Sequence, residues 1–131
     1  MWDQSDNALE FADNAKATFG DSQDLQLYHD GSQSIIQDAG TGQLRISGEN
    51  TVAITNASGT ETYARFLKDS QVELFYDGTK RFSTSGVGVT VYNQLDTTNI
   101  NASGIITAVD GNFTGNVSIA GTLTYQDVTN V

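Results

Sequence analysis

Apolar side chains in this sequence recur at alternate positions, in short runs that are bounded by turn-forming residues. Such runs occur at residues 52–54, 72–74 and 87–91, with Gly, Asn, Asp or Ser nearby on either side. A period of two places the apolar side chains on one face of a strand, whereas a helix would distribute them around its axis. The alternation therefore predicts an all-β chain of short strands, each buried on one side only.

The same alternation predicts further strands. It covers residues 44–46 and is most regular near the C-terminus, where five side chains share odd parity: Phe113, Val117, Ile119, Leu123 and Tyr125. Residues 60–70 fit either two turns of a helix or a strand, and we favour the strand. The chain has no proline, so every residue keeps the backbone N–H that a sheet requires.

Two Asp-Gly pairs are expected to form tight hairpin turns. Asp30 and Gly31 lie between two apolar runs, and so do Asp77 and Gly78. Glycine tolerates a positive φ, and an aspartate side chain can accept hydrogen bonds from the backbone that follows it. We interpret these four residues as structural turns rather than as a functional site.

An internal repeat organises much of the chain. Segments that begin at Leu9, Leu25 and Val72 share an apolar-polar-apolar strand followed by a turn with Asp or Asn. Each segment closes on an apolar residue at the same offset, namely Phe19, Ile35 and Phe82. The copies are irregularly spaced, so they predict similar hairpins added in series rather than a strict solenoid.

Charge and composition exclude several classes of partner. The 131 residues include 16 acidic and 6 basic side chains, which gives a formal net charge of -10. Nucleic-acid binding normally needs clustered Lys and Arg, and here the six are scattered. Apolar runs fall far short of the roughly 18 residues of a membrane-spanning helix. We expect neither a nucleic-acid partner nor membrane insertion.

Candidate chemistry is sparse. His29 is the only histidine and lies beside a predicted turn, without the pattern of a catalytic triad. Glycan cleavage needs two carboxylates, and with 16 acidic residues in the chain, the presence of such a pair is no evidence of catalysis. We therefore assign no catalytic residue, cofactor or metal site and expect a protein that is not an enzyme. Six aromatic side chains could offer flat faces to a host surface glycan: Trp2, Tyr28, Tyr63, Phe75, Tyr76 and Tyr92.

Residues 8–19, 24–32 and 117–125 closely resemble segments that recur in tail-fibre and other virion structural proteins of cyanophages and related marine tailed phages. The resemblance implies a β-rich, homotrimeric virion fibre that is made in the host cytoplasm and assembles with other tail or fibre proteins. It implies no catalytic residues. Fibre proteins of this kind are usually far longer, so the chain is expected to be one module, a short relative or a piece of such a protein.

The residues give an independent reason to expect a trimer. Each strand offers one narrow apolar row, which three copies could bury around a common axis while pairing their strand edges. We expect hairpin-rich β modules over residues 1–82 and a thin, intertwined trimeric shaft over 83–131, built as a triple β-helix or a β-prism. The predicted trimer core consists of Val87, Val89, Val91, Val117, Ile119, Leu123 and Tyr125.

Two other readings remain open. One is a monomeric β-sandwich that serves as an adhesin or a carbohydrate-binding module on a cell or virion surface. The other is a fragment of a tailspike that degrades polysaccharide.

Overall fold

The structure is a computed structural model that describes residues 1–124. This part of the chain contains ten β-strands and no helix, which confirms the predicted all-β class. It consequently has no helix that could cross a membrane. The chain divides into two units, Met1–Gln94 and Leu95–Val131, which we describe separately.

All ten strands belong to the first unit, where they form three antiparallel sheets. The two-stranded sheet consists of β1 (Trp2–Asp3) and β2 (Ala8–Leu9). The three-stranded sheet consists of β3 (Ala17–Phe19), β4 (Leu25–His29) and β5 (Ser34–Asp38). The five-stranded sheet consists of β6 (Thr51–Thr55), β7 (Thr62–Leu67), β8 (Val72–Tyr76), β9 (Thr79–Ser85) and β10 (Gly88–Val91).

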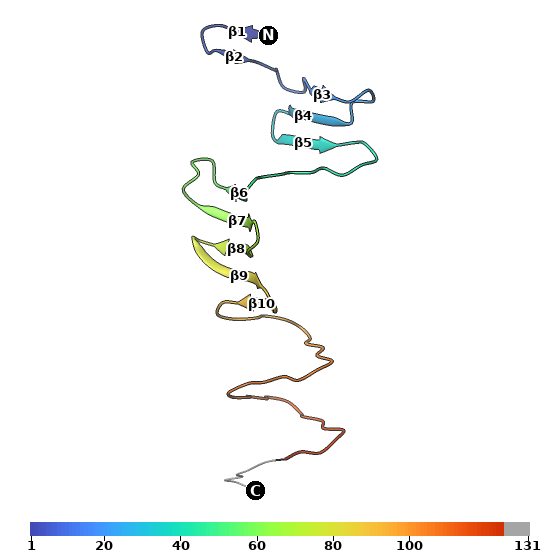
Figure 1. Cartoon of the computed structure of the whole chain (residues 1–131), viewed down its shortest axis with the longest axis vertical. Coiled ribbons are helices and arrows are strands. Elements are labelled where there is room, and N and C mark those ends of the chain that lie inside the picture. The colour runs from blue at the N-terminus through green and yellow to red at the C-terminus, as the bar shows by residue number, and fades with distance from the viewer. Residues whose placement is uncertain (125–131) are drawn as a thin grey trace. The chain divides into compact units, whose positions relative to one another are not determined.

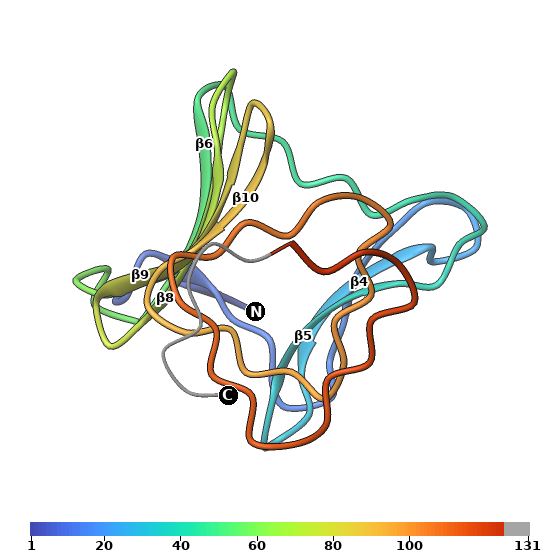
Figure 2. The ribbon, with the colours of Figure 1, turned by 90° about the horizontal axis from the view of Figure 1, so that it is seen from below.

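Every strand pairs with its neighbour along the chain, so each sheet is a series of hairpins (Figure 1). In the view of Figure 2, β6 and β10 run close together, and β8 and β9 are drawn to their left. Within residues 1–124, no strand of one sheet contacts a strand of another. The two larger sheets also leave apolar side chains exposed, so the described residues lack the buried layer between two packed sheets that the β-sandwich of the alternative reading requires.

Most of the expected strands are present. The alternating runs at 52–54, 72–74 and 87–91 fall in β6, β8 and the β9–β10 hairpin, and the ambiguous stretch 60–70 contains β7. The strand expected at 44–46 is absent. The three residues 44–46 can add few ladder hydrogen bonds, and Leu44 and Ile46 instead line a groove beside β6 and β7.

The second unit contains no strand among its described residues, 95–124, which run as the thin orange-to-red trace in Figure 1. The strands expected from the alternation over 113–124 are therefore wrong for the single chain. The physical reason is that the backbone groups of this segment make no hydrogen bond to the backbone of any described residue. Residues 83–91, which we placed at the start of the shaft, belong to β9, β10 and the turn between them.

The two Asp-Gly pairs occupy turns of different length. Asp77 and Gly78 form a two-residue turn between β8 and β9, with φ angles of 49° and 67°. Two successive positive φ angles suit the right-handed twist of a hairpin. Asp30 and Gly31 lie in a longer loop between β4 and β5, where Oδ1 of Asp30 accepts hydrogen bonds from the N–H groups of Ser32 (2.8 Å) and Gln33 (2.7 Å). These bonds lower the pKa of Asp30.

The three repeat copies share a turn followed by a strand, although their pairing differs. In the second and third copies the turn closes a hairpin, β4–β5 and β8–β9. In the first copy, Leu9 ends β2, and a turn with Asn14 at a φ of 65° leads into β3, which pairs with β4 instead. The closing residues Phe19, Ile35 and Phe82 all lie in the strand after the turn.

We expect Gly78→Ala to lower the free energy of unfolding by about 1 kcal/mol, because alanine pays a steric cost at positive φ. Urea unfolding at one fixed protein concentration measures this change. Gly86→Ala is the matched control, since Gly86 lies in the next hairpin turn without a positive φ and with open space around its Cα. Equal effects of the two substitutions would contradict the assigned turn geometry.

Candidate functional site

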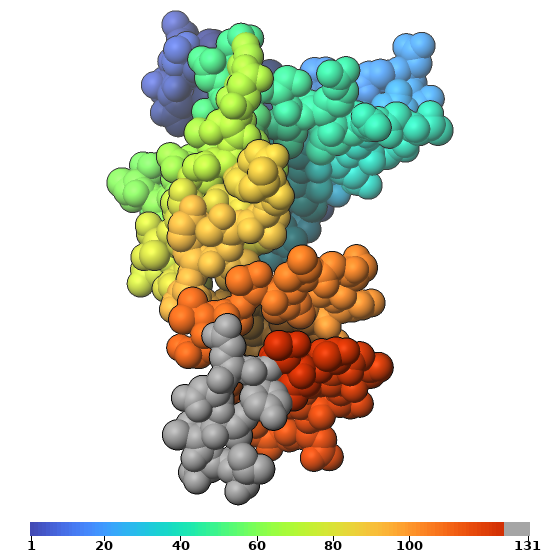
Figure 3. Space-filling model, turned by 60° about the horizontal axis from the view of Figure 1, so that its bottom comes forward, coloured from blue at the N-terminus to red at the C-terminus, as the bar shows by residue number. Residues whose placement is uncertain are grey.

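The five-stranded sheet carries most of its apolar side chains on one face. Five of them are in register and form a row across all five strands: Ile54, Ala64, Leu74, Phe82 and Val91. Val52, Phe66, Val72 and Val89 lie on the same face by strand parity. We call these nine residues the apolar face. In Figure 3 the five strands, coloured green to gold, form one continuous block of atoms.

The apolar face lies open in the single chain. Ala64 is the one buried apolar residue among residues 1–124, whereas Ile54, Phe66 and Leu74 are 54%, 46% and 44% exposed. An apolar groove crosses part of this face, lined by Leu44, Ile46, Val52, Ile54 and Phe66. A soluble monomer rarely leaves a continuous apolar surface of this kind uncovered.

The opposite face is closed by charged side chains. We call it the polar face, and it includes Arg65, Glu73, Lys80 and Ser83. Glu73 and Ser83 are only 3% and 2% exposed, so the most deeply buried residues of the described chain are polar. The Glu73 carboxylate accepts hydrogen bonds from Nε of Arg65 (2.9 Å) and from Nζ of Lys80 (3.0 Å). The amide of Gln71 donates a third hydrogen bond to it, at 2.6 Å.

These contacts explain how the Glu73 carboxylate can be buried although most side chains of the described residues are exposed. The hydrogen bond from Lys80 lowers the pKa of Glu73, burial opposes that change, and Arg65 and Gln71 lower the pKa further. No buried side-chain nitrogen or oxygen lacks a partner in the part of the chain that the structure describes. The network is thus fully satisfied within one chain.

Tyr92 extends this network to the end of β10. Its hydroxyl lies 3.1 Å from Oγ of Ser83, and Nζ of Lys80 lies 5.0 Å from its ring centroid. Its backbone N–H also donates to the carbonyl of Arg81. The hydrogen bonds of Ser83 and Lys80 lower the pKa of Tyr92. The polar face therefore ties β7, β8, β9 and the end of β10 together.

The three-stranded sheet has the same two-sided organisation. Ala17, Leu27 and Ile36 form an in-register row on one face, where Leu27 and Ile36 are exposed. On the other face, Lys16 donates a hydrogen bond to Gln26 at 2.7 Å and lies 4.5 Å from the ring centroid of Tyr28. Both larger sheets thus close their polar side internally and leave their apolar side open.

The second unit lacks partners for its backbone as well as for its side chains. Residues 95–124 make no backbone-to-backbone hydrogen bond with any described residue. Their apolar side chains are exposed, and Ile105 and Val109 reach 94% and 100%. Backbone polar groups need partners when they are buried. This segment therefore cannot bury its apolar side chains without another strand beside it.

The predicted trimer-core residues fall in three places. Val89 and Val91 lie on the apolar face, whereas Val87 is in the β9–β10 turn and fully exposed. Val117, Ile119 and Leu123 are exposed in the second unit. Tyr125 lies outside the described residues.

Sequence reasoning missed the cross-strand row and the Glu73 network. Parity placed Ile54 and Leu74 in half-buried strands, but it did not give the register that aligns them with Phe82 and Val91. The available signal for the network was opposite charge at alternating positions of neighbouring strands, as in Arg65 and Glu73.

The aromatic side chains considered for glycan binding are mostly engaged within the chain. Tyr28, Phe75, Tyr76 and Tyr92 each have a Lys or Arg over the ring, at 4.5 to 6.0 Å from the centroid. Trp2 and Tyr63 are 59% and 47% exposed.

His29 is exposed in β4, and its Nδ1 lies 3.3 Å from Oγ of Ser34. A catalytic histidine would need a nucleophile and an orienting carboxylate in one line of contacts. The contact with Ser34 is a cross-strand pair of the β4–β5 hairpin.

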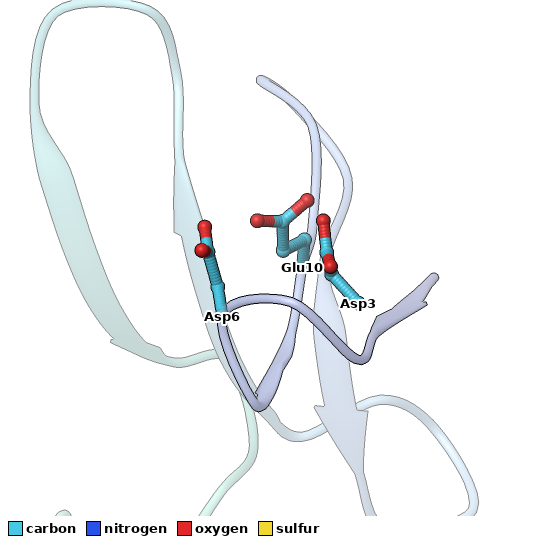
Figure 4. Close-up of side chains that lie close together, drawn as sticks. All are labelled: Asp3, Asp6 and Glu10. Carbon is cyan, nitrogen blue, oxygen red and sulfur yellow. The ribbon is translucent and has the colours of Figure 1, made fainter.

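Three carboxylates gather near the N-terminus, from Asp3, Asp6 and Glu10 (Figure 4). Their oxygens lie within 4.8 Å of one another, close enough to surround a cation. Asp3 accepts hydrogen bonds from the hydroxyl (2.6 Å) and the N–H (2.8 Å) of Ser5, which lower its pKa. Exposed acidic groups often lie this close without a metal, so we assign no site here.

Comparison with known proteins gives no relative: no protein-family model, no curated protein and no solved structure matches this chain. The candidate site is therefore defined by its geometry, as two open apolar sheet faces and a second unit without backbone partners.

The lowered pKa of Glu73 predicts that the stability it contributes is present above the ordinary glutamate pKa and is lost as the pH falls through the lowered value. Glu73→Gln should cost about 1–3 kcal/mol at neutral pH, because Arg65 and Lys80 lose a charged partner. Its unfolding curve should approach that of the unmodified protein as the pH falls through the lowered pKa of Glu73, where the carboxylate becomes neutral as well.

Chemical denaturation across this pH range measures both curves. Glu49→Gln is the control, since Glu49 forms an exposed ion pair with Lys68 at 3.2 Å. Loss of that pair should change the free energy of unfolding by less than about 1 kcal/mol. A Glu73→Gln curve parallel to that of the unmodified protein at every pH would contradict the role given to Glu73.

Proposed function

We propose that this chain is a structural component of a bacteriophage tail fibre or a related virion fibre. It acts as a homotrimer that forms a rigid β-rich rod or spacer and takes part in attachment to the host. The proposal is carried by one observation, namely that the single chain leaves its apolar sheet faces open. Residues 8–19, 24–32 and 117–125 resemble segments of phage fibre proteins. This resemblance supports a location in the virion and an assembly of three copies.

Exposed apolar side chains support an obligate assembly. Among residues 1–124, Ala64 is the one buried apolar residue, and large side chains such as Ile36, Ile54 and Phe66 are 61%, 54% and 46% exposed. Obligate oligomers bury large, apolar interfaces. Partner chains that cover these side chains supply the core that one copy lacks.

The second unit supports an intertwined shaft. Three copies of residues 95–124, side by side, could pair their free backbone groups and turn their apolar side chains toward a common axis. This stretch has only two charged residues, Asp96 and Asp110, in a chain with a net charge of -10. Copies placed side by side there would repel one another weakly.

The mechanism of such a protein is mechanical. A rod of interchain strand pairs resists unfolding because its chains must separate before any of them can open fully. It would hold a receptor-binding tip at a distance from the particle, together with other tail or fibre proteins. Its place is the virion after synthesis in the host cytoplasm, and a host surface glycan is a further candidate partner.

We expect the full chain to sediment and scatter light as a particle of three times 14.0 kDa. The reason is that the exposed apolar surface has no other cover. Multi-angle light scattering combined with sedimentation velocity, over a hundredfold range of concentration, measures the mass. A folded particle with the mass of one chain at the highest concentration would contradict the proposal.

A second experiment tests the place of the protein. Antibodies against the chain should label the tail fibres of purified particles of the phage that encodes it, as seen by electron microscopy. Pre-incubation of the antibodies with the pure chain serves as the control and should remove the label. Absence of the chain from purified particles would contradict a virion role even if the chain is trimeric.

A further inference from the structure

We infer that copies of this chain meet through the apolar face of the five-stranded sheet, with the polar face turned away from the contact. This inference rests on the proposed function, because it requires the copies to assemble. It specifies which of the two sides of the sheet is the interface. The predicted trimer core named only Val89 and Val91 on this sheet.

The first argument is the continuity of the apolar row. Ile54, Ala64, Leu74, Phe82 and Val91 are directly opposite one another across five strands, without a charged side chain among them. The two register shifts of the sheet, after Ile54 and after Leu74, fall just beyond the row and leave it intact. A row of this length offers a partner one unbroken apolar strip.

The second argument is that the polar face already has its partners. Arg65, Lys80 and Gln71 saturate the Glu73 carboxylate, and Ser83 and Tyr92 contact each other. A protein that covered this face would have to desolvate the exposed part of Arg65 without offering a better acceptor. Exposure of the polar face to water therefore costs little free energy, whereas exposure of the apolar face is unfavourable.

The third argument identifies the occupant as a second copy of this chain. The three-stranded sheet repeats the same plan, so any partner must cover two apolar rows within one unit. Another copy offers two such rows of its own, and identical chains commonly assemble through symmetric contacts.

Two neighbouring residues of β6 provide a matched test. Ile54 lies on the apolar face, and Ala53 lies opposite Arg65 on the polar face. Ile54→Glu should weaken association of the full chain at least 100-fold, because each interface would bury uncompensated carboxylates. Ala53→Glu should change association less than threefold. Leu74→Glu, at the centre of the row, should behave like Ile54→Glu.

Thiol protection keeps the inference testable if a glutamate variant does not fold. The chain has no cysteine, so Leu74→Cys and Ala53→Cys each introduce a single reporter. In the assembled protein, alkylation of the thiol at position 74 should be at least tenfold slower than at position 53. In the isolated chain Leu74 is 44% exposed, so its thiol would react readily without a partner.

The outcomes separate this inference from the proposed function. An unmodified protein with the mass of one chain overturns both. An unmodified oligomer that keeps its mass in Ile54→Glu and Leu74→Glu, with a freely alkylated thiol at position 74, overturns the choice of face and leaves the fibre proposal standing. Dissociation by Ala53→Glu with protection at position 53 also overturns it.

Discussion

Each of the two larger sheets pairs its strands within one molecule but leaves its apolar face without a partner. Backbone pairing holds the strands in register, yet only Ala64 of the apolar side chains is buried among residues 1–124. Burial of apolar area is the main favourable contribution to folding. The remaining apolar side chains can be removed from water only by surface from another molecule. One chain therefore forms the sheets but does not bury their apolar faces.

The polar face determines which side of the five-stranded sheet faces water. Glu73 brings the positive charges of Arg65 and Lys80 onto one side of β7, β8 and β9. A buried carboxylate is tolerated because several donors surround it. The same three side chains leave the opposite side free of charge along its central row. Charge pairing on one face thus defines the apolar character of the other.

The sequence predicts the strands better than their pairing. Alternation at residues such as Val52 and Leu74 identifies a strand and its buried side, because parity is a local property. The row from Ile54 to Val91 depends on register across five strands, and the Glu73 network depends on the same register. Residues 113–124 alternate as strongly, yet form no strand in one chain, since alternation cannot supply a partner edge.

The hairpin connectivity has a kinetic consequence. Within each sheet, strands that follow one another in the chain pair with each other, so the contacts of the sheets are local in sequence. Chains with such low contact order fold quickly, because little loop entropy is lost before each pairing. The hairpins can therefore form in each newly made chain before it meets another copy. In the assembly that we propose, the encounter of copies would then limit the rate, and maturation would depend on how many chains are synthesised close together.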